Sequence, residues 1–339
     1  MIMYEFNTTG DRELMDRLKE MVGAGILIDT CGAVKIGEKV VIASDRGKIK
    51  IANIIADACI ERGIEPIILN MIPRKSHGEE PSVPYKAALK AADVVFAATS
   101  FSLFHTNARI EACKNGVRWV NLPEFSMKML RKGGLFVNFY RQREKAEKIG
   151  KILSAASIIH VKTEKGTDIQ FSIVGREAIV ESGISDKPGM VNSPPDIECC
   201  IAPIEGTAKG KIVIDGSIVL PGLGPLKKEV VLTVYKGFVE KIEGSGEAML
   251  FKEILQNVAE KEAYNIGEFG IGLNPECKLC GSMLEDEGVF GTIHFGIGDN
   301  HTIGGCVESS MHTDVVIKNP TVIIDQKTLI SRGEHINNS

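Results

Sequence analysis

Residues 39–69 read KVVIASDRGKIKIANIIADACIERGIEPIIL, and this stretch decides the fold of the first half of the chain. A short β-branched run at 40–42 is followed by apolar residues at helical spacing over 49–62. Gly63 is the kind of residue that ends a helix, and 65–69 supplies a second apolar run. A strand, a helix and a strand in this order predict a βαβ unit with parallel strands.

The same alternation continues outward from this stretch. Strand-like runs follow at 93–97 and 118–121, with helical patterns at 85–91, 107–115 and 142–153. These elements predict a doubly wound α/β domain over residues 1–154. A dinucleotide-binding glycine fingerprint and a Walker A motif are both missing from it, so the sequence does not favour nucleotide binding.

The pattern changes after residue 156. Short β-branched runs at 158–162, 167–171, 211–214 and 230–234 are separated by Gly, Asp, Asn and Pro, and the main helical pattern lies at 248–262. We therefore predict a second domain over residues 155–339. It would be α+β, mainly antiparallel β, and would carry the metal site.

Composition limits the kind of partner. The 339 residues include 40 Lys plus Arg and 44 Asp plus Glu, a net charge of −4, which argues against nucleic acid and anionic membranes. A peptide or small-molecule substrate is expected instead. Residues 1–7 lack the pattern of a secretory signal, so we expect a cytoplasmic protein whose eight cysteines are thiols.

Ionisable side chains gather in apolar runs of the second domain. His312 and Asp314 are two residues apart in a strand-like run and would project from the same face. His294 and Glu268 lie in similar runs, and Glu198 follows the Pro-Pro-Asp segment at 194–196. Imidazoles with carboxylates form a ligand set for Zn, Co, Mn or Fe(II), and five ligands make two metals plausible. The alternative is that each group is an ordinary paired polar residue of the core.

The chain resembles the aminopeptidase T and aminopeptidase S type of metallopeptidase. The resemblance is carried by the stretches 166–172, 175–176, 198–203, 266–275, 291–298 and 309–314. It implies an aminopeptidase-like hydrolase and a homodimer, with two Zn, Co or Mn ions per chain bound by Glu198, Glu268, His294, His312 and Asp314. Glu198 or Glu268 would act as general base, and His301 would replace the tyrosine that the family places after its first histidine.

A second branch with the same fold, the 2,5-dihydroxypyridine dioxygenases, is also similar. That resemblance implies one Fe(II) bound by His294, His312 and Asp314, with open positions for substrate and oxygen. A third hypothesis is a non-catalytic metal-binding or ligand-binding scaffold. Binding of metal by both Glu198 and Glu268 would favour the hydrolase over the dioxygenase.

The first domain offers one further candidate, His105. It follows the strand-like run 93–97 at its carboxyl end, where open α/β sheets bind ligands, and Arg109 lies one helical turn later. A similar segment recurs in both family branches, which suggests that His105 acts as a base or holds the substrate. The alternative is a simple helix start capped by Thr106.

Overall fold

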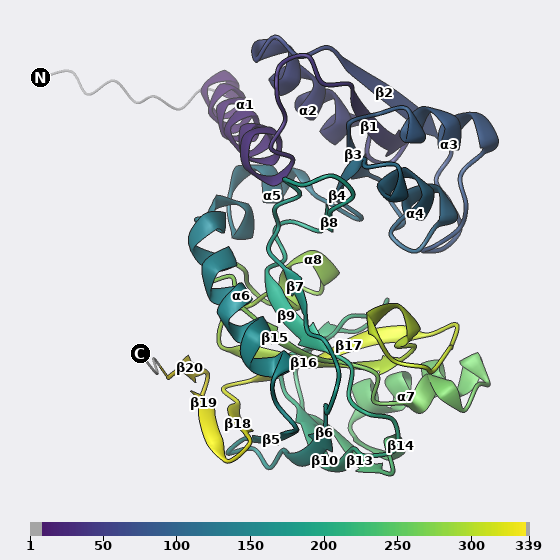
Figure 1. Cartoon of the computed structure of the whole chain (residues 1–339), viewed down its shortest axis with the longest axis vertical. Helices are drawn as coiled ribbons and strands as arrows, with labels where there is room; N and C mark the ends of the chain where they lie inside the picture. The colour runs from purple at the N-terminus through teal and green to yellow at the C-terminus, as the bar shows by residue number, and fades with distance from the viewer. Residues whose placement is uncertain (1–8, 337–339) are drawn as a thin grey trace, which may run out of the picture. The chain divides into compact units, whose positions relative to one another are not determined.

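The computed structural model of the protein describes residues 9–336, which form two compact units (Figure 1). Within the described residues, unit 1 comprises residues 9–139 and Gly183–Pro194, and unit 2 comprises Tyr140–Ser182 and residues 195–336. Residues 1–7, on which the prediction about a secretory signal rests, lie outside the described residues. In the described part of the chain, no helix is both long enough and apolar enough to span a bilayer.

Unit 1 is built on a parallel sheet, as the sequence predicted. Its described residues form strands in the order β2-β1-β3-β4-β8, and these neighbouring strands all pair in parallel. The strands are β1 Val40–Asp45, β2 Pro66–Met71, β3 Val94–Ala98, β4 Arg118–Asn121 and β8 Val191–Asn192. The helices are α1 Thr9–Ile26, η1 Leu27–Cys31, α2 Ile49–Glu61, α3 Val83–Lys90, α4 Asn107–Lys114, α5 Met127–Arg131 and η2 Gly134–Phe136.

The boundary between the units differs from the predicted one at 154/155. Helix α6, Phe139–Ser154, belongs to unit 2 from Tyr140 onward, and Gly183–Pro194 returns to unit 1 to supply β8. The helix lies tightly against unit 2, because a Cβ at Gly150 would come within 2.6 Å of Val180 and 3.5 Å of the Cys199 Sγ. A charged amphipathic helix shows in its sequence which face is apolar, but not which unit covers that face.

Unit 2 contains antiparallel sheets, as predicted. Its described residues form one eight-stranded sheet, β14-β13-β10-β6-β5-β18-β19-β20, and one seven-stranded sheet, β12-β11-β17-β16-β15-β9-β7. The first comprises β5 Ile158–Lys162, β6 Asp168–Ser172, β10 Lys209–Ile214, β13 Val230–Tyr235, β14 Phe238–Gly244, β18 Thr321–Ile324, β19 Lys327–Ser331 and β20 Glu334–His335. The second comprises β7 Ile179–Glu181, β9 Glu198–Ile201, β11 Ser217–Ile218, β12 Gly224–Pro225, β15 Phe269–Gly272, β16 Thr292–Gly298 and β17 His312–Lys318. The helices of this unit are α6, α7 Gly246–Val258, η3 Glu262–Tyr264, α8 Met283–Asp286 and η4 His301–Ile303.

Phenylalanines join the two sheets of unit 2. Phe171 of β6 packs against Phe269 of β15 and Phe295 of β16, with ring centroids 5.4 to 5.8 Å apart. All three side chains are buried. Since neighbouring residues of a strand point to opposite faces, Glu268 and His294 are turned to the other face of the seven-stranded sheet. We call this second face the acidic face of the sheet.

Candidate metal centre

Four adjacent strands of the seven-stranded sheet position the candidate ligands. Residues paired across neighbouring strands project from the same face, and so do alternate residues along one strand. The pairing joins Asp314 to Gly296, His312 to Gly298, His294 to Gly270 and Glu198 to Gly272. Glu268 lies beside Gly296, with which it exchanges backbone hydrogen bonds. The structure therefore places Glu198, Glu268, His294, His312 and Asp314 together on the acidic face.

Three of these side chains form one group of potential metal ligands. Glu268, His312 and Asp314 each offer one ligand atom, and these atoms lie within 4.8 Å of one another. The His312 Nε2 is 3.4 Å from a Glu268 oxygen and 3.6 Å from the Asp314 Oδ1. The His312 Nδ1 donates a hydrogen bond to the backbone carbonyl of Asp299 at 2.8 Å. This bond fixes the imidazole so that its Nε2 is directed to the carboxylates.

The other histidine lies on the opposite side of Glu268. The His294 Nε2 is 3.0 Å from the Glu198 Oε2 and 3.7 Å from the Glu268 Oε1. Glu268 thus directs one carboxylate oxygen to each imidazole. His294 does not join the close group formed by Glu268, His312 and Asp314, so the His294–His312–Asp314 triad stays a prediction.

Two glycines leave the space that these side chains occupy. A Cβ at Gly270 would overlap the His294 imidazole. A Cβ at Gly296 would lie 2.6 Å from the Glu268 Cβ and 2.8 Å from the His312 Cε1. Because both positions are glycine, the His294 and His312 imidazoles lie over the sheet without meeting a Cβ.

The charged groups of the acidic face shift one another's protonation. Burial would lower the pKa of His294, but the Glu198 and Glu268 carboxylates raise it well above its usual value. Partial burial would also lower the pKa of His312, but the Asp314 and Glu268 carboxylates raise it to about 10. Burial raises the pKa of Glu198. Burial would raise the pKa of Asp314, but the His312 and His294 imidazoles outweigh this effect and lower it.

Buried atoms without partners indicate that this cluster accommodates a metal ion. Among the described residues, the Glu198 Oε2, the His294 Nδ1 and the Asp314 Oδ1 are buried and make no hydrogen bond. The Glu198 Oε2 and the His294 Nε2 touch without hydrogen-bond geometry. Buried polar atoms are normally paired, and imidazole with carboxylate is a donor set that divalent transition metals accept. The residues therefore fit a metal of this class.

Three acids that were not predicted from the sequence face the same cluster. Glu181 pairs with Glu198 across β7 and β9, and oxygens of Asp196 and Glu287 lie within 4.8 Å of a Glu198 oxygen. Asp196 precedes Glu198 by two residues, a strand-like spacing that offered a signal. Glu287 follows α8 and lies far from Glu198 in the sequence, so local spacing gave no indication of it. The structure also places the Cys200 thiol beside Glu198 and Glu268.

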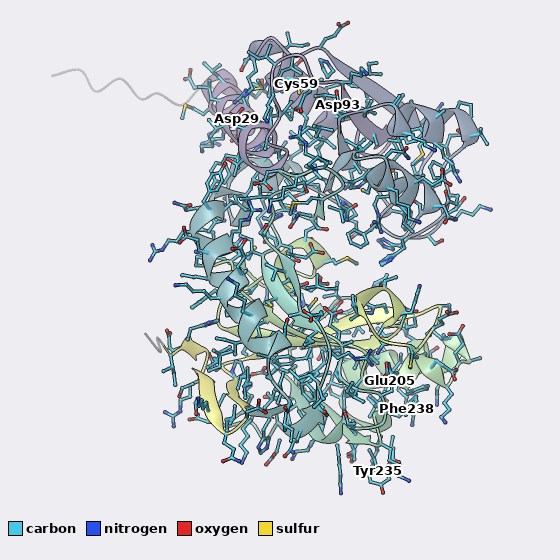
Figure 2. The ribbon with its side chains drawn as sticks, in the orientation of Figure 1. Asp29, Cys59, Asp93, Glu205, Tyr235 and Phe238 are labelled. Carbon is cyan, nitrogen blue, oxygen red and sulfur yellow. The ribbon has the colours of Figure 1, made fainter. Side chains whose placement is uncertain are left out.

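A loop beside the cluster carries His301. The His301 side chain is about half exposed, and its Nδ1 donates to the Asp299 carboxylate at 2.8 Å. Glu205, labelled in Figure 2, holds this loop by accepting hydrogen bonds from the Asn300 side chain and the Cys306 backbone. His301 is thus linked through Asp299 to His312, and its catalytic role stays a prediction.

His105 lies in unit 1, between β3 and α4, whereas the other candidates belong to unit 2. Its catalytic role stays a prediction. The capping interpretation of this segment agrees with the geometry. Thr106 is the N-cap of α4, and its side-chain oxygen accepts a hydrogen bond from the Arg109 N–H at 3.2 Å.

Comparisons with known proteins favour one of the two families that the sequence resembles. The family model described as 2,5-dihydroxypyridine 5,6-dioxygenase matches residues 28–337. A curated 2,5-dihydroxypyridine 5,6-dioxygenase from Pseudomonas putida is 26% identical over 260 residues, which cover 73% of this chain and 72% of the relative.

Two solved structures share the fold. The 2,5-dihydroxypyridine dioxygenase of Pseudomonas putida has a TM-score of 0.81 at 20% identity, covering 95% of this chain and 98% of that one. AmpT from Thermus thermophilus has a TM-score of 0.68 at 13% identity, covering 94% and 99%. At these identities, the likenesses show the fold alone.

These findings correct our first functional prediction. We expected an aminopeptidase-like hydrolase, but the matching family model describes dioxygenases and the curated relative is a dioxygenase. The peptidase branch is supported only by likeness of fold. The physical reason is that imidazoles and carboxylates bind the metals of both chemistries, so the ligand types did not separate the branches. The enzyme and metal-binding parts of the prediction are supported, and the chain belongs to the 2,5-dihydroxypyridine 5,6-dioxygenase family.

Proposed function

We propose that this protein is an Fe(II)-dependent dioxygenase that opens the ring of a hydroxylated pyridine, with 2,5-dihydroxypyridine as the first substrate to test. The observation that carries the proposal is the convergence of Glu268, His312 and Asp314 on the acidic face. Family membership supports the reaction class, and the name of the curated relative suggests the substrate.

In this proposal, one histidine and two carboxylates hold the iron. His312 contributes its Nε2, because its Nδ1 is engaged by the Asp299 carbonyl. Asp314 and Glu268 contribute oxygens and balance the charge of the cation. When bound, ferrous iron would supply the redox chemistry that joins dioxygen to the ring. His294 stays available as a further ligand or as a group that moves protons of the substrate hydroxyls.

Oxygen consumption tests the proposal. Protein purified anaerobically and loaded with Fe(II) should consume oxygen when 2,5-dihydroxypyridine is added, with loss of the aromatic absorbance of the substrate. The Asp314→Asn variant should lose iron and activity together. Asp168→Asn is the matched control, because Asp168 also pairs with a histidine, His160, but on the other sheet of unit 2. Iron-loaded protein that consumes no oxygen with any hydroxypyridine would contradict the proposal and favour the non-catalytic scaffold.

Assembly and location remain expectations from the sequence. We propose a homodimer, which sedimentation of the purified chain tests directly, and a cytoplasmic enzyme acting on a small molecule. A monomer at micromolar concentration would contradict the first expectation.

A further inference from the structure

A second group of acids lies beside the proposed iron ligands. Oxygens of Asp196, Glu198 and Glu287 approach within 4.8 Å of one another. Asp196 ends the Pro-Pro-Asp segment before β9, Glu198 is the first residue of β9, and Glu287 follows α8 directly. Only 3% of Asp196 and 5% of Glu198 is exposed. Glu287 as a whole is half-buried, but its Oε1 is buried, so the three acids bring carboxylate oxygens together where water is largely excluded.

These acids lack the partners that buried carboxylates normally have. Across residues 11–336, the Asp196 Oδ1, the Glu198 Oε2 and the Glu287 Oε1 are buried without a hydrogen bond. In the same part of the chain, no ion pair involves Asp196 or Glu287, and Glu198 pairs only with His294. Other buried acids are satisfied differently. Asp45 accepts backbone N–H groups from Gly47 and Ser100, and Asp286 accepts them from Cys280 and Gly281.

Leaving three such carboxylates ionised and unpaired would cost a large amount of free energy. Two arrangements remove that cost: a bound cation, or protons shared between the carboxyl groups. The backbone leaves the carboxylates free to approach one another, because Gly288 has no side chain where a Cβ would lie 2.6 Å from the Asp196 Oδ1. The donor atoms are all oxygens, which hard divalent cations prefer, whereas the proposed iron ligands include an imidazole.

We propose that Asp196, Glu198 and Glu287 bind a hard divalent cation of the Mg²⁺ or Mn²⁺ type, at a second site beside the iron held by Glu268, His312 and Asp314. The two sites adjoin, because a Glu198 oxygen lies within 4.8 Å of a Glu268 oxygen and the Glu287 carboxyl contacts Asp314. The cation would connect β9 to the segment after α8 and balance the excess negative charge of the acidic face. The proposal does not rest on the dioxygenase activity.

Manganese binding tests the site. We expect the full chain, stripped of metal with a chelator, to bind two Mn²⁺ per chain, measured as the loss of the free-ion signal in electron paramagnetic resonance. Asp196→Asn keeps the size of the side chain and should weaken one of the two sites by at least the 10- to 100-fold that is typical of losing an outer-shell partner. His312→Gln should weaken the other site and leave the first in place. Glu20→Gln is the control, because Glu20 is a buried acid of unit 1 that pairs with Arg131.

Two outcomes would overturn the proposal. Asp196→Asn could bind Mn²⁺ with unchanged number and affinity, which would mean that the three acids share protons instead of a cation. Crystals soaked in Mn²⁺ could show anomalous density at Glu268, His312 and Asp314 but none among Asp196, Glu198 and Glu287. Both measurements are independent of oxygen consumption, so failure of the proposed function would leave their results interpretable.

Discussion

His335 shows how burial controls the protonation of a single side chain in this protein. Its ring stacks on Phe290 with centroids 4.8 Å apart, and within the described residues its Nε2 is buried without a hydrogen-bond partner. Burial, with a smaller contribution from Lys145, lowers the pKa of His335 to about 4. The ring is therefore neutral in the folded protein at neutral pH.

This pKa predicts a loss of stability in mild acid. A histidine in the unfolded chain has a pKa of about 6.5, so the unfolded state takes up a proton first as the pH falls. His335 makes its full contribution to the free energy of unfolding above about pH 6.5. This contribution, about 1–3 kcal/mol in all, is lost as the pH falls from about 6.5 to about 4. His335→Phe keeps an aromatic ring and cannot be protonated. Urea unfolding at pH 7.5 and 4.5 should show a smaller loss for this variant, and an equal loss would exclude His335 as the cause.

Strand β16 shows how one element both builds the core and presents the site. Its buried residues Ile293, Phe295 and Ile297 face the eight-stranded sheet, while His294 and Gly296 lie on the acidic face. The strand pairs with β15 on one side and β17 on the other, so it brings Glu268 and Asp314 to the same level of the sheet. A side chain at Gly296 would occupy the space between them.

We predict that Gly296→Ala weakens metal binding without unfolding the protein. The added Cβ would lie 2.6 Å from the Glu268 Cβ and 2.8 Å from the His312 Cε1, so both ligands must shift. Metal affinity, measured by titration with Fe(II) under nitrogen, should fall more than about tenfold. Gly246→Ala is the control, because nothing lies within 4 Å of a Cβ at Gly246. Equal affinities in the two variants would show that Gly296 does not shape the site.

The candidate functional side chains are divided between the two units. The candidate ligands in the cluster all come from unit 2, whereas His105 belongs to unit 1. Trp119, the single tryptophan of the sequence, is fully buried in β4 of unit 1. Its fluorescence therefore reports on unit 1, while calorimetry records the melting of both units.

This arrangement predicts that removing metal destabilises one unit selectively. A ligand present at 100 times its dissociation constant stabilises the folded state by about 2.7 kcal/mol. Chelation should therefore lower the melting temperature of unit 2 by about 5–10 °C in calorimetry. The melting curve followed by Trp119 fluorescence should stay in place. Parallel shifts of both signals would show instead that the two units unfold together.

Several features of the fold and the site could be predicted from the sequence because they depend on neighbouring residues. The β-branched runs and helical spacings of 39–69 predicted the parallel sheet, and the alternation of His312, Thr313 and Asp314 predicted which side chains share a face. The periodicity of a strand or a helix involves only a few neighbouring residues, so it can be recognised directly in the sequence. The sequence by itself thus determined the class of each unit and the types of side chain that form the site.

Contacts between distant segments were decided only by the tertiary structure. Asp196 and Glu287 meet because β9 and the segment after α8 come together, and α6 joins unit 2 because its apolar face packs there. Such contacts depend on sheet register and on packing across long stretches of chain, which local periodicity does not encode. The sequence therefore determined which ligand types are present, and the tertiary structure decided which of them share one site, because convergence in space is a property of the packed sheets.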